Sequence, residues 1–251
     1  MSGHSKWATI KHQKGAADAK RGQIFTKLSR EIILSAKEGG PDPDMNARLR
    51  LAVQKAKDAR MPSDNIERAI KKGSGQLEGE TLLELTLEGY GPGGVAVLVH
   101  AVSDNRNRAI QEVRHLFTKS GGAMGEAGCV SWIFEPKGSI TVKTDGRDTD
   151  ELTLEVIDAG AEDVKTDDEE YMEVVTAPDQ LEKVRLALEA KGLTIESAGM
   201  DMHPKTLIEL DEDTAMQALK LLTAMEELED VQNVYSNADF DPAVVEKFQA
   251  A

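Results

Sequence analysis

Lysine and arginine side chains are concentrated near the start of the sequence, at spacings that favour contact with a phosphate backbone. The candidate contact residues are Lys6, Lys11, His12, Lys14, Lys20, Arg21, Lys27, Arg30, Arg60, Arg68, Lys71 and Lys72. Within the first 30 residues only Asp18 offsets these cations. Such clusters bind nucleic acid with an affinity that falls as salt rises. Trp7, which lies among the lysines, could stack on an unpaired base.

The charge is divided unevenly along the chain. Residues 1–75 contain 16 Lys and Arg against 8 Asp and Glu, whereas the remainder contains 14 against 37. The first part therefore carries +8 and the rest −23, within a total of −15. This asymmetry favours a nucleic-acid-binding head on an acidic body over the alternative of a solvated arm and ordinary charged helix faces.

The loop over residues 60–65 lies between two basic helices. Pro62 would end the first helix, and Asp64 would cap the next one with Glu67 as its capping-box partner. The functional alternative is an exposed tip at which Met61, Pro62 and Asn65 touch RNA or a protein. For an exposed Met61, substitution by Ala is predicted to cost no more than about 0.5 kcal/mol.

The segment Asp104-Asn-Arg-Asn-Arg108 opens another predicted helix, where backbone N–H groups favour anions. Arg106 and Arg108 are therefore candidate contacts. The plainer interpretation is that Asp104 is an N-cap and that both arginines are surface residues.

Signals for catalysis and for metal binding are weak. The single cysteine, Cys129, excludes an internal disulfide and a Cys-rich zinc site, and it lies in an apolar predicted strand. Asp148-x-Asp150 and Asp201-x-His203 could bind a divalent cation, but such spacings arise by chance among 45 acidic residues. We therefore expect no catalytic residue, no metal and no cofactor. A metal-dependent enzyme is the least favoured alternative.

Hydrophobic periodicity predicts an α+β fold. Helices are expected over residues 16–38, 45–61, 64–73, 104–120 and 213–228, and strands over 81–88, 95–102, 129–134, 206–210 and 231–236. Residues 138–199 follow the order βαββαβ, which is the ferredoxin-like pattern. The predicted domains are a helical domain (1–76), a discontinuous middle α+β domain (77–134 and 204–251) and an inserted ferredoxin-like domain (135–203).

The sequence has neither an apolar run of the ~20 residues that a membrane helix needs nor the apolar stretch of a secretory signal. We therefore expect a cytoplasmic protein with no membrane partner.

Several motifs together resemble the YebC/PmpR family over essentially the whole chain. They are Gly3-His-Ser-Lys-Trp-Ala-Thr-Ile-Lys-His12, Arg21-Gly-Gln-Ile-Phe-Thr-Lys27, the stretch from Met61 to Gly73, the stretch from Glu88 to Val95, Asp104-Asn-Arg-Asn-Arg108 and Gly128-Cys-Val-Ser-Trp132. The resemblance implies three domains, one of them inserted, and no established enzymatic activity or cofactor.

The same resemblance implies two candidate functions. Bacterial family members are described as DNA-binding transcriptional regulators, and this is the leading hypothesis. Other members, including the mitochondrial translational activator of cytochrome c oxidase, are placed on the ribosome, where they help translation through proline-rich stretches. The alternative is therefore a ribosome-associated translation factor that binds ribosomal RNA.

Overall fold

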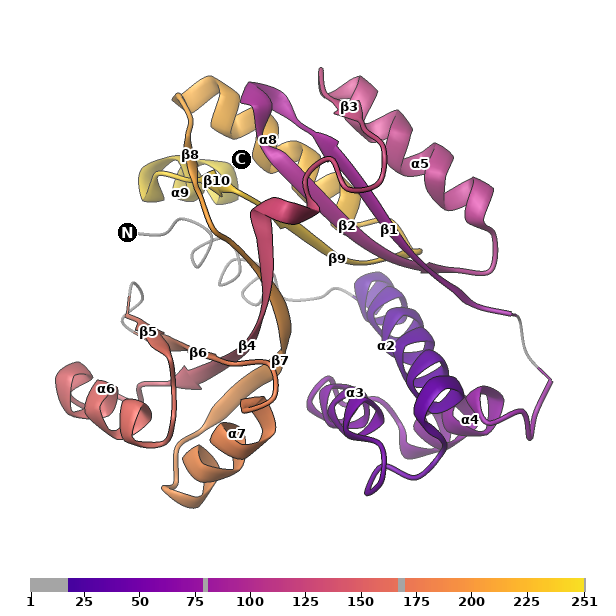
Figure 1. Ribbon diagram of the computed structural model, residues 1–251, viewed down its shortest axis with the longest axis vertical. Helices are drawn as coiled ribbons and strands as arrows, with labels where there is room; N and C mark the ends of the chain where they lie inside the picture. The colour runs from indigo at the N-terminus through magenta and orange to yellow at the C-terminus, as the bar shows by residue number, and fades with distance from the viewer. Residues whose placement is uncertain (1–17, 79–80, 167–169, 251) are drawn as a thin grey trace.

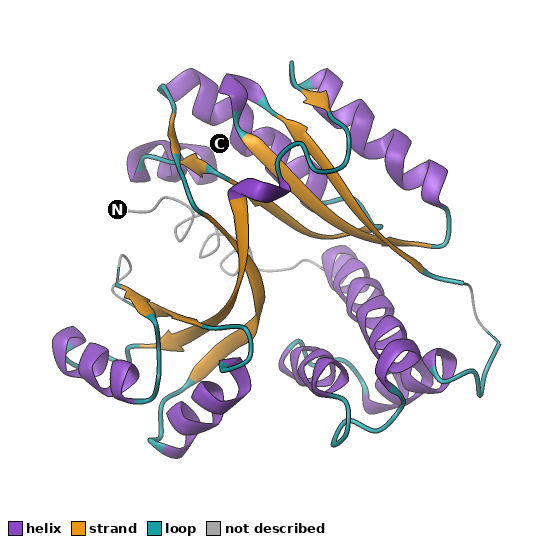
Figure 2. Ribbon diagram, viewed as in Figure 1, coloured by secondary structure: helices purple, strands orange, loops and turns teal. Residues whose placement is uncertain are grey.

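The structure is a computed structural model that describes residues 18–78, 81–166 and 170–250. Three parts are visible: a helical unit, a sheet covered by helices at the upper side of Figure 1, and a second sheet with its own helices at the lower left. Helices, strands and loops are distinguished by colour in Figure 2. None of the helices in the described ranges is long and apolar enough to cross a membrane.

The helical unit comprises α2 (Asp18–Gly39), α3 (Ala47–Asp58) and α4 (Ser63–Gly73). Its core contains Ile32, Leu49, Ala52, Ala56 and Ile66, at the three- and four-residue spacing of amphipathic helices. Small alanines allow the helices to pack closely. Between α2 and α3, the Asn46 side chain accepts from the Leu49 amide at 3.0 Å and donates to the Ser35 carbonyl at 2.8 Å. Asn46 therefore caps α3 and holds it against α2.

The predicted cap at Asp64 is wrong. Helix α4 begins at Ser63, its N-cap position is Pro62, and no side chain caps it. Asp64 instead lies in the first turn, where its charge complements the helix dipole.

The middle sheet has the order β3-β1-β2-β9, and all of its pairings are antiparallel. Its strands are β1 (Leu83–Tyr90), β2 (Ala96–Ser103), β3 (Ala123–Met124) and β9 (Val231–Ser236). The turn η1 (Pro92–Gly94) joins β1 to β2, which confirms that this Gly-rich segment belongs to a hairpin. Helices α5 (Arg106–Lys119) and α8 (Glu212–Glu226) cover one face, where Val97, Val99, Phe117 and Leu219 form the core.

The C-terminal part adds a short pairing and a helix. Strands β8 (Ile208–Glu209) and β10 (Ala238–Asp239) pair in parallel, apart from the main sheet. Helix α9 (Pro242–Ala250), which was not predicted from the sequence, packs on α8 through Val244 and Val245.

The second sheet follows the predicted βαββαβ order. Its elements are β4 (Phe134–Lys143), α6 (Thr149–Asp158), β5 (Asp163–Lys165), β6 (Tyr171–Thr176), α7 (Leu181–Ala190) and β7 (Ile195–Pro204). The strand order is β5-β6-β4-β7 and every pairing is antiparallel, which is the ferredoxin-like arrangement. The chain enters on β4 and leaves on β7, and these strands pair from Phe134 and Pro204 onward. The exact domain limits stay a prediction.

The predicted strand over residues 129–134 is wrong, and the buried carboxylate of Glu88 explains why. It accepts hydrogen bonds from the backbone amides of Gly128, Val130 and Ser131, each at 2.8 Å. These amides therefore cannot donate hydrogen bonds to a neighbouring strand. The segment therefore forms a turn followed by η2 (Ser131–Ile133), and the strand starts only at Phe134.

Candidate nucleic-acid interface

The exposed cations of α4 and the loop before it are the best-placed phosphate ligands in the described part of the chain. Arg60, Arg68 and Lys72 are exposed, and no carboxylate in the described ranges forms an ion pair with them. Lys71 contacts Glu67 at 3.8 Å across an exposed helix turn, where an ion pair contributes little. The guanidinium and ammonium groups of these residues are therefore available to an anion.

A groove of about 570 Å³ lies between α2, the end of α4 and the segment that leads to β1. Three cations line it, Arg30, Lys37 and Lys72, together with the hydroxyls of Thr26 and Ser29. Its carboxylates are Glu78 and Glu229. We call this the basic groove. Lys37 was not among the predicted contacts, although its spacing from Lys27 and Arg30 places it on the same helix face.

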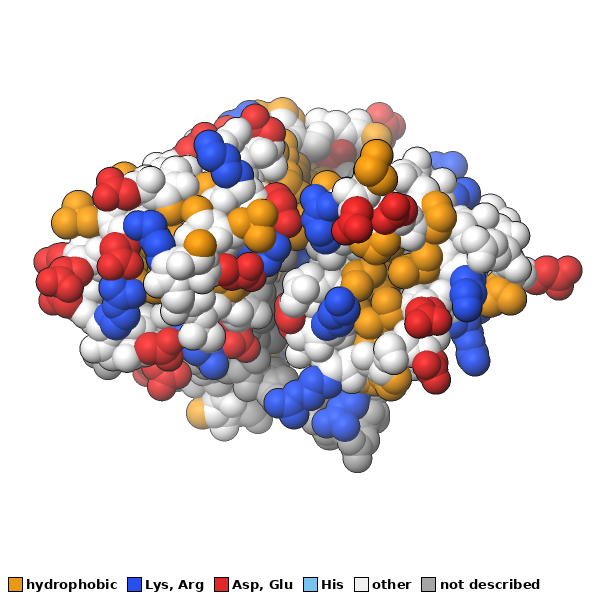
Figure 3. All heavy atoms as spheres, turned by 90° about the horizontal axis from the view of Figure 1, so that it is seen from below, with side chains coloured by type: hydrophobic (Ala, Val, Ile, Leu, Met, Phe, Trp, Pro, Cys, Tyr) orange, Lys and Arg blue, Asp and Glu red, His pale blue; other side chains and the backbone are white. Residues whose placement is uncertain are grey.

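Viewed from below, the helical unit forms the right-hand part of the molecule (Figure 3). Hydrophobic side chains gather in its middle, and both basic and acidic side chains lie around them. On the left-hand part, acidic and basic side chains are interspersed.

Lys27 and Arg30 contact the body of the protein. Lys27 Nζ donates to the Glu226 carbonyl at 2.6 Å. Arg30 donates to the Glu229 carbonyl at 2.7 Å and forms an ion pair with Asp230 at 3.0 Å. The Arg30 side chain is only 11% exposed. The basic face of α2 therefore docks the helical unit on the turn between α8 and β9.

Met61 is not at an exposed tip, so this expectation was wrong. Its side chain is 5% exposed and belongs to the core of the helical unit. Arg60, before it, adopts a positive φ of 58°, which turns the chain so that Met61 faces inward while Pro62 and Asn65 stay exposed. A flexible thioether fills a small core of this kind well.

The two candidate arginines at the start of α5 differ in environment. Arg108 forms ion pairs with Asp104 at 2.6 Å and Asp230 at 2.9 Å, and these two partners raise its pKa further above the ordinary value. Arg106 is exposed and has no ion-pair partner among the described residues. The N-cap of this helix is Asn105 rather than the predicted Asp104. Arg106 is thus the better candidate for contact with a ligand.

The remaining candidates lie at the N-terminus. Lys6, Trp7, Lys11, His12 and Lys14 fall outside the described residues, as does the side chain of Lys20. Arg21, in the first turns of α2, is exposed.

A second cleft, of about 450 Å³, lies where the three parts of the molecule meet. Its charged side chains are largely paired: Arg48 contacts Glu84 at 2.9 Å, and Lys55 contacts Glu31 at 3.5 Å. Burial lowers the pKa of His100 in its wall, so that this imidazole is neutral at pH 7. The mixed and internally compensated charge makes this cleft a poorer phosphate site than the basic groove.

Cys129 has no features of a nucleophile. It lies in the turn held by Glu88, and burial, followed by the nearby Glu88 charge, raises the pKa of its thiol. A raised pKa reduces the fraction of reactive thiolate at neutral pH.

Two sequence models of one protein family match the chain. The TACO1/YebC N-terminal domain matches residues 5–76, and the TACO1/YebC second and third domain matches residues 82–238. The chain belongs to the TACO1/YebC family. The resemblance inferred from the sequence motifs is therefore confirmed.

Other members of the TACO1/YebC family are similar over their full length. A "Probable transcriptional regulatory protein" of Dehalococcoides mccartyi (strain CBDB1) is 69% identical over 250 residues, which are 100% of this chain and 99% of the relative. A protein of the same name from Desulfosudis oleivorans is 53% identical and covers 98% of this chain and 100% of the relative.

Among solved structures, the crystal structure of a conserved hypothetical protein from Aquifex aeolicus matches with a TM-score of 0.87 at 50% identity. The match covers 94% of this chain and 97% of that one. The predicted fold class, a helical N-terminal part followed by α+β parts, is confirmed for this member of the TACO1/YebC family.

Proposed function

We propose that this chain is a non-enzymatic regulator of gene expression that binds DNA through the basic groove and the exposed face of α4. The single observation that carries the proposal is the set of exposed cations without carboxylate partners in the described ranges: Lys37, Arg60, Arg68 and Lys72. Unpaired cations gain more from a phosphate than paired ones, because no existing ion pair must be broken. The basic N-terminal arm would extend the same surface.

The name shared by the relatives, "Probable transcriptional regulatory protein", supports DNA as the target. It describes regulation and not catalysis, which agrees with the inert environment of Cys129. A regulator of this kind acts in the cytoplasm of a bacterium.

The binding mode in this proposal is contact with the nucleic-acid backbone. Lysines and arginines spread over a groove and a helix face position a duplex but do not by themselves read bases. The acidic body limits how the duplex can approach, since like charges repel. The duplex would therefore approach most favourably from the side of the helical unit.

The experiment is a salt titration of binding by the full-length chain, measured by fluorescence anisotropy with a labelled DNA duplex and, in parallel, a structured ribosomal RNA fragment. We expect a negative slope of log affinity against log salt for the wild type. Lys72→Glu and Arg68→Glu should weaken binding at low salt and reduce the steepness of the slope. Tighter binding to DNA than to RNA would support transcriptional regulation.

Lys220→Glu is the matched control. Lys220 is an exposed lysine of α8 on the acidic body, so the same charge reversal changes the net charge equally but at a distant site. Equal loss of affinity in Lys72→Glu and Lys220→Glu would mean that overall charge alone governs binding, and the basic groove would be refuted. Preference for the RNA fragment would contradict the DNA assignment while leaving the surface intact.

A further inference from the structure

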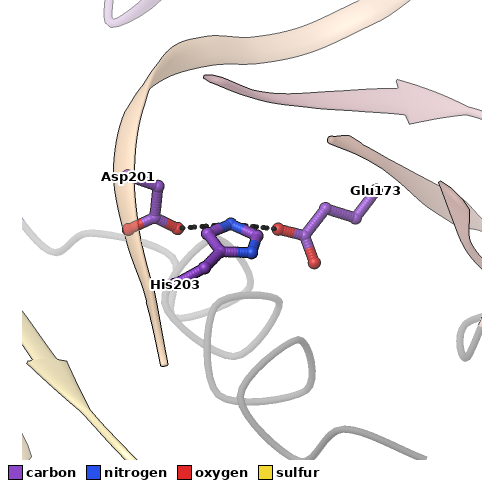
Figure 4. A group of neighbouring side chains, drawn as sticks. All are labelled: Glu173, Asp201 and His203. Carbon is purple, nitrogen blue, oxygen red and sulfur yellow. Dashed lines mark ion pairs between the residues drawn. The ribbon is translucent and has the colours of Figure 1, made fainter. Parts of the chain in front are cut away.

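Three potential metal ligands converge on the face of the second sheet that is turned away from α6 and α7. Glu173 lies on β6, and Asp201 and His203 lie two positions apart on β7, so that both side chains emerge on the same side of the strand. One ligand atom from each residue lies within 4.8 Å of the other two. In Figure 4 the His203 imidazole stands between the two carboxylates, and both point toward it.

The separations fit a shared cation better than a hydrogen bond. His203 Nε2 is 3.7 Å from Glu173 Oε1 and 3.8 Å from Asp201 Oδ2. Both distances exceed the usual range of an N–H···O hydrogen bond. Ligand atoms bound to one tetrahedral Zn²⁺ lie about 3.3–3.6 Å from one another, given metal–ligand distances near 2.0–2.2 Å. Small side-chain rotations would therefore bring these three atoms into a first coordination sphere.

The His203 side chain lies largely inside the protein and is only 14% exposed. An imidazole nitrogen is a good ligand for Zn²⁺.

Neighbouring groups hold the Glu173 carboxylate in the required orientation. Lys165 Nζ forms an ion pair with Oε2 at 3.2 Å, and the Ser139 hydroxyl donates to Oε1 at 3.1 Å. Contacts of this kind to a ligand carboxylate fix its direction and tune the site. The Lys165 charge also opposes a cation, so we expect moderate rather than very tight affinity. The surrounding segment compensates in part, because residues 134–203 contain 7 Lys and Arg against 19 Asp and Glu.

We propose that Glu173, Asp201 and His203 bind one divalent transition-metal ion, with Zn²⁺ preferred, and that this ion joins β6 to β7 across β4. One nitrogen and two carboxylate oxygens form a mixed set that suits Zn²⁺ and, less well, Mn²⁺. The sequence spacing Asp201-x-His203 was too common to indicate a site, and Glu173 becomes its third member only through the folding of the sheet. This inference does not rest on the proposed binding of DNA.

The experiment is isothermal titration calorimetry of the full-length, chelator-treated chain with ZnCl₂ and, separately, MnCl₂. We expect one Zn²⁺ of moderate affinity per chain, weaker binding of Mn²⁺, and a rise in melting temperature on addition of Zn²⁺. His203→Ala, Asp201→Asn and the isosteric Glu173→Gln should each lower the Zn²⁺ affinity by about tenfold or more. Circular dichroism of each variant without metal checks that it is folded.

Two matched controls separate this site from adventitious binding elsewhere. His115→Ala removes an exposed imidazole on α5, and Glu196→Gln removes an exposed carboxylate on β7. Both should bind Zn²⁺ like the wild type. The proposal is overturned if the wild type binds no Zn²⁺, or if the three cluster variants bind it as tightly as the controls do. Even if His203→Ala did not fold, the two isosteric variants would still decide between these outcomes.

Discussion

Arg30 on α2 and Asp230 before β9 form an ion pair of 3.0 Å that joins the helical unit to the body. The Asp230 side chain is 3% exposed, and it also accepts hydrogen bonds from Arg108 at 2.9 Å and from the Ser103 hydroxyl at 2.8 Å. One buried carboxylate thus connects guanidinium groups from two parts of the molecule. Some of the positive charge that suggests nucleic-acid binding is therefore used to hold the protein together.

Asp230→Asn should lower the free energy of unfolding by about 3–5 kcal/mol, because the largely buried guanidinium of Arg30 loses its buried counter-charge. Urea unfolding measured by circular dichroism provides the number. Glu229→Gln is the control, since the Glu229 side chain is 60% exposed and its ion pair with Arg30 should contribute less than about 1 kcal/mol. Similar losses in the two variants would contradict a special role for Asp230.

Met61→Ala should destabilise the protein by about 2–5 kcal/mol, because it leaves a cavity in the small core of the helical unit. Thermal and urea unfolding would detect a loss of this size. Met45, which is 84% exposed at the approach to α3, provides the matched control, and Met45→Ala should change stability by less than about 0.5 kcal/mol. A negligible effect of Met61→Ala would contradict a packing role for Met61 in this core.

Glu88→Gln should cost about 1–3 kcal/mol at pH 7, because the amide replaces one acceptor oxygen by a donor that faces backbone N–H groups. Burial by itself would raise the pKa of Glu88, but the amides of Gly128, Val130 and Ser131 together outweigh burial and lower the pKa. The ionised carboxylate therefore stabilises the fold above the unfolded-state pKa.

This stabilisation should be lost as the pH falls through the lowered, folded-state pKa. Urea unfolding between pH 7 and pH 3 should show the difference between wild type and Glu88→Gln shrinking on acidification. Glu126→Gln, an exposed change in the same turn, should show no such trend. A difference that is constant with pH would mean that ionisation of Glu88 is unimportant.

Arg106→Ala should weaken DNA binding, whereas Arg108→Ala should lower stability. The first removes an exposed side chain, so we expect weaker DNA binding with a salt slope smaller by about 1 and an unchanged melting temperature. The second removes a partner of buried Asp230 and should lower the melting temperature clearly. Measuring anisotropy and thermal unfolding for both variants tests the distinction. A fall in stability for Arg106→Ala would show that it, too, has a structural role.

Local sequence determined the elements and their order. The βαββαβ pattern, the hairpin at residues 89–94 and the strand Val231–Ser236 were predictable because hydrophobic periodicity and turn residues act over a few positions. A prediction failed where a side chain distant in sequence accepted hydrogen bonds from backbone amides that a strand would have used. The carboxylate of Glu88 accepts hydrogen bonds from the amides of residues 128, 130 and 131, so these amides cannot pair with a strand. The residues around Cys129 give no local signal of these contacts.

The sequence by itself also determined that positive charge is concentrated in the first 75 residues. Only the tertiary structure decided which of those charges are available. Arg30 contacts Glu229, which lies 199 residues away in the sequence. Glu173 lies close to Asp201 and His203 only because the sheet brings their strands together. Pairing energies depend on distance and burial in space, which the spacing of residues along a chain does not specify. The composition therefore gives the total charge of a segment, and the fold determines which of its charged side chains a ligand can reach.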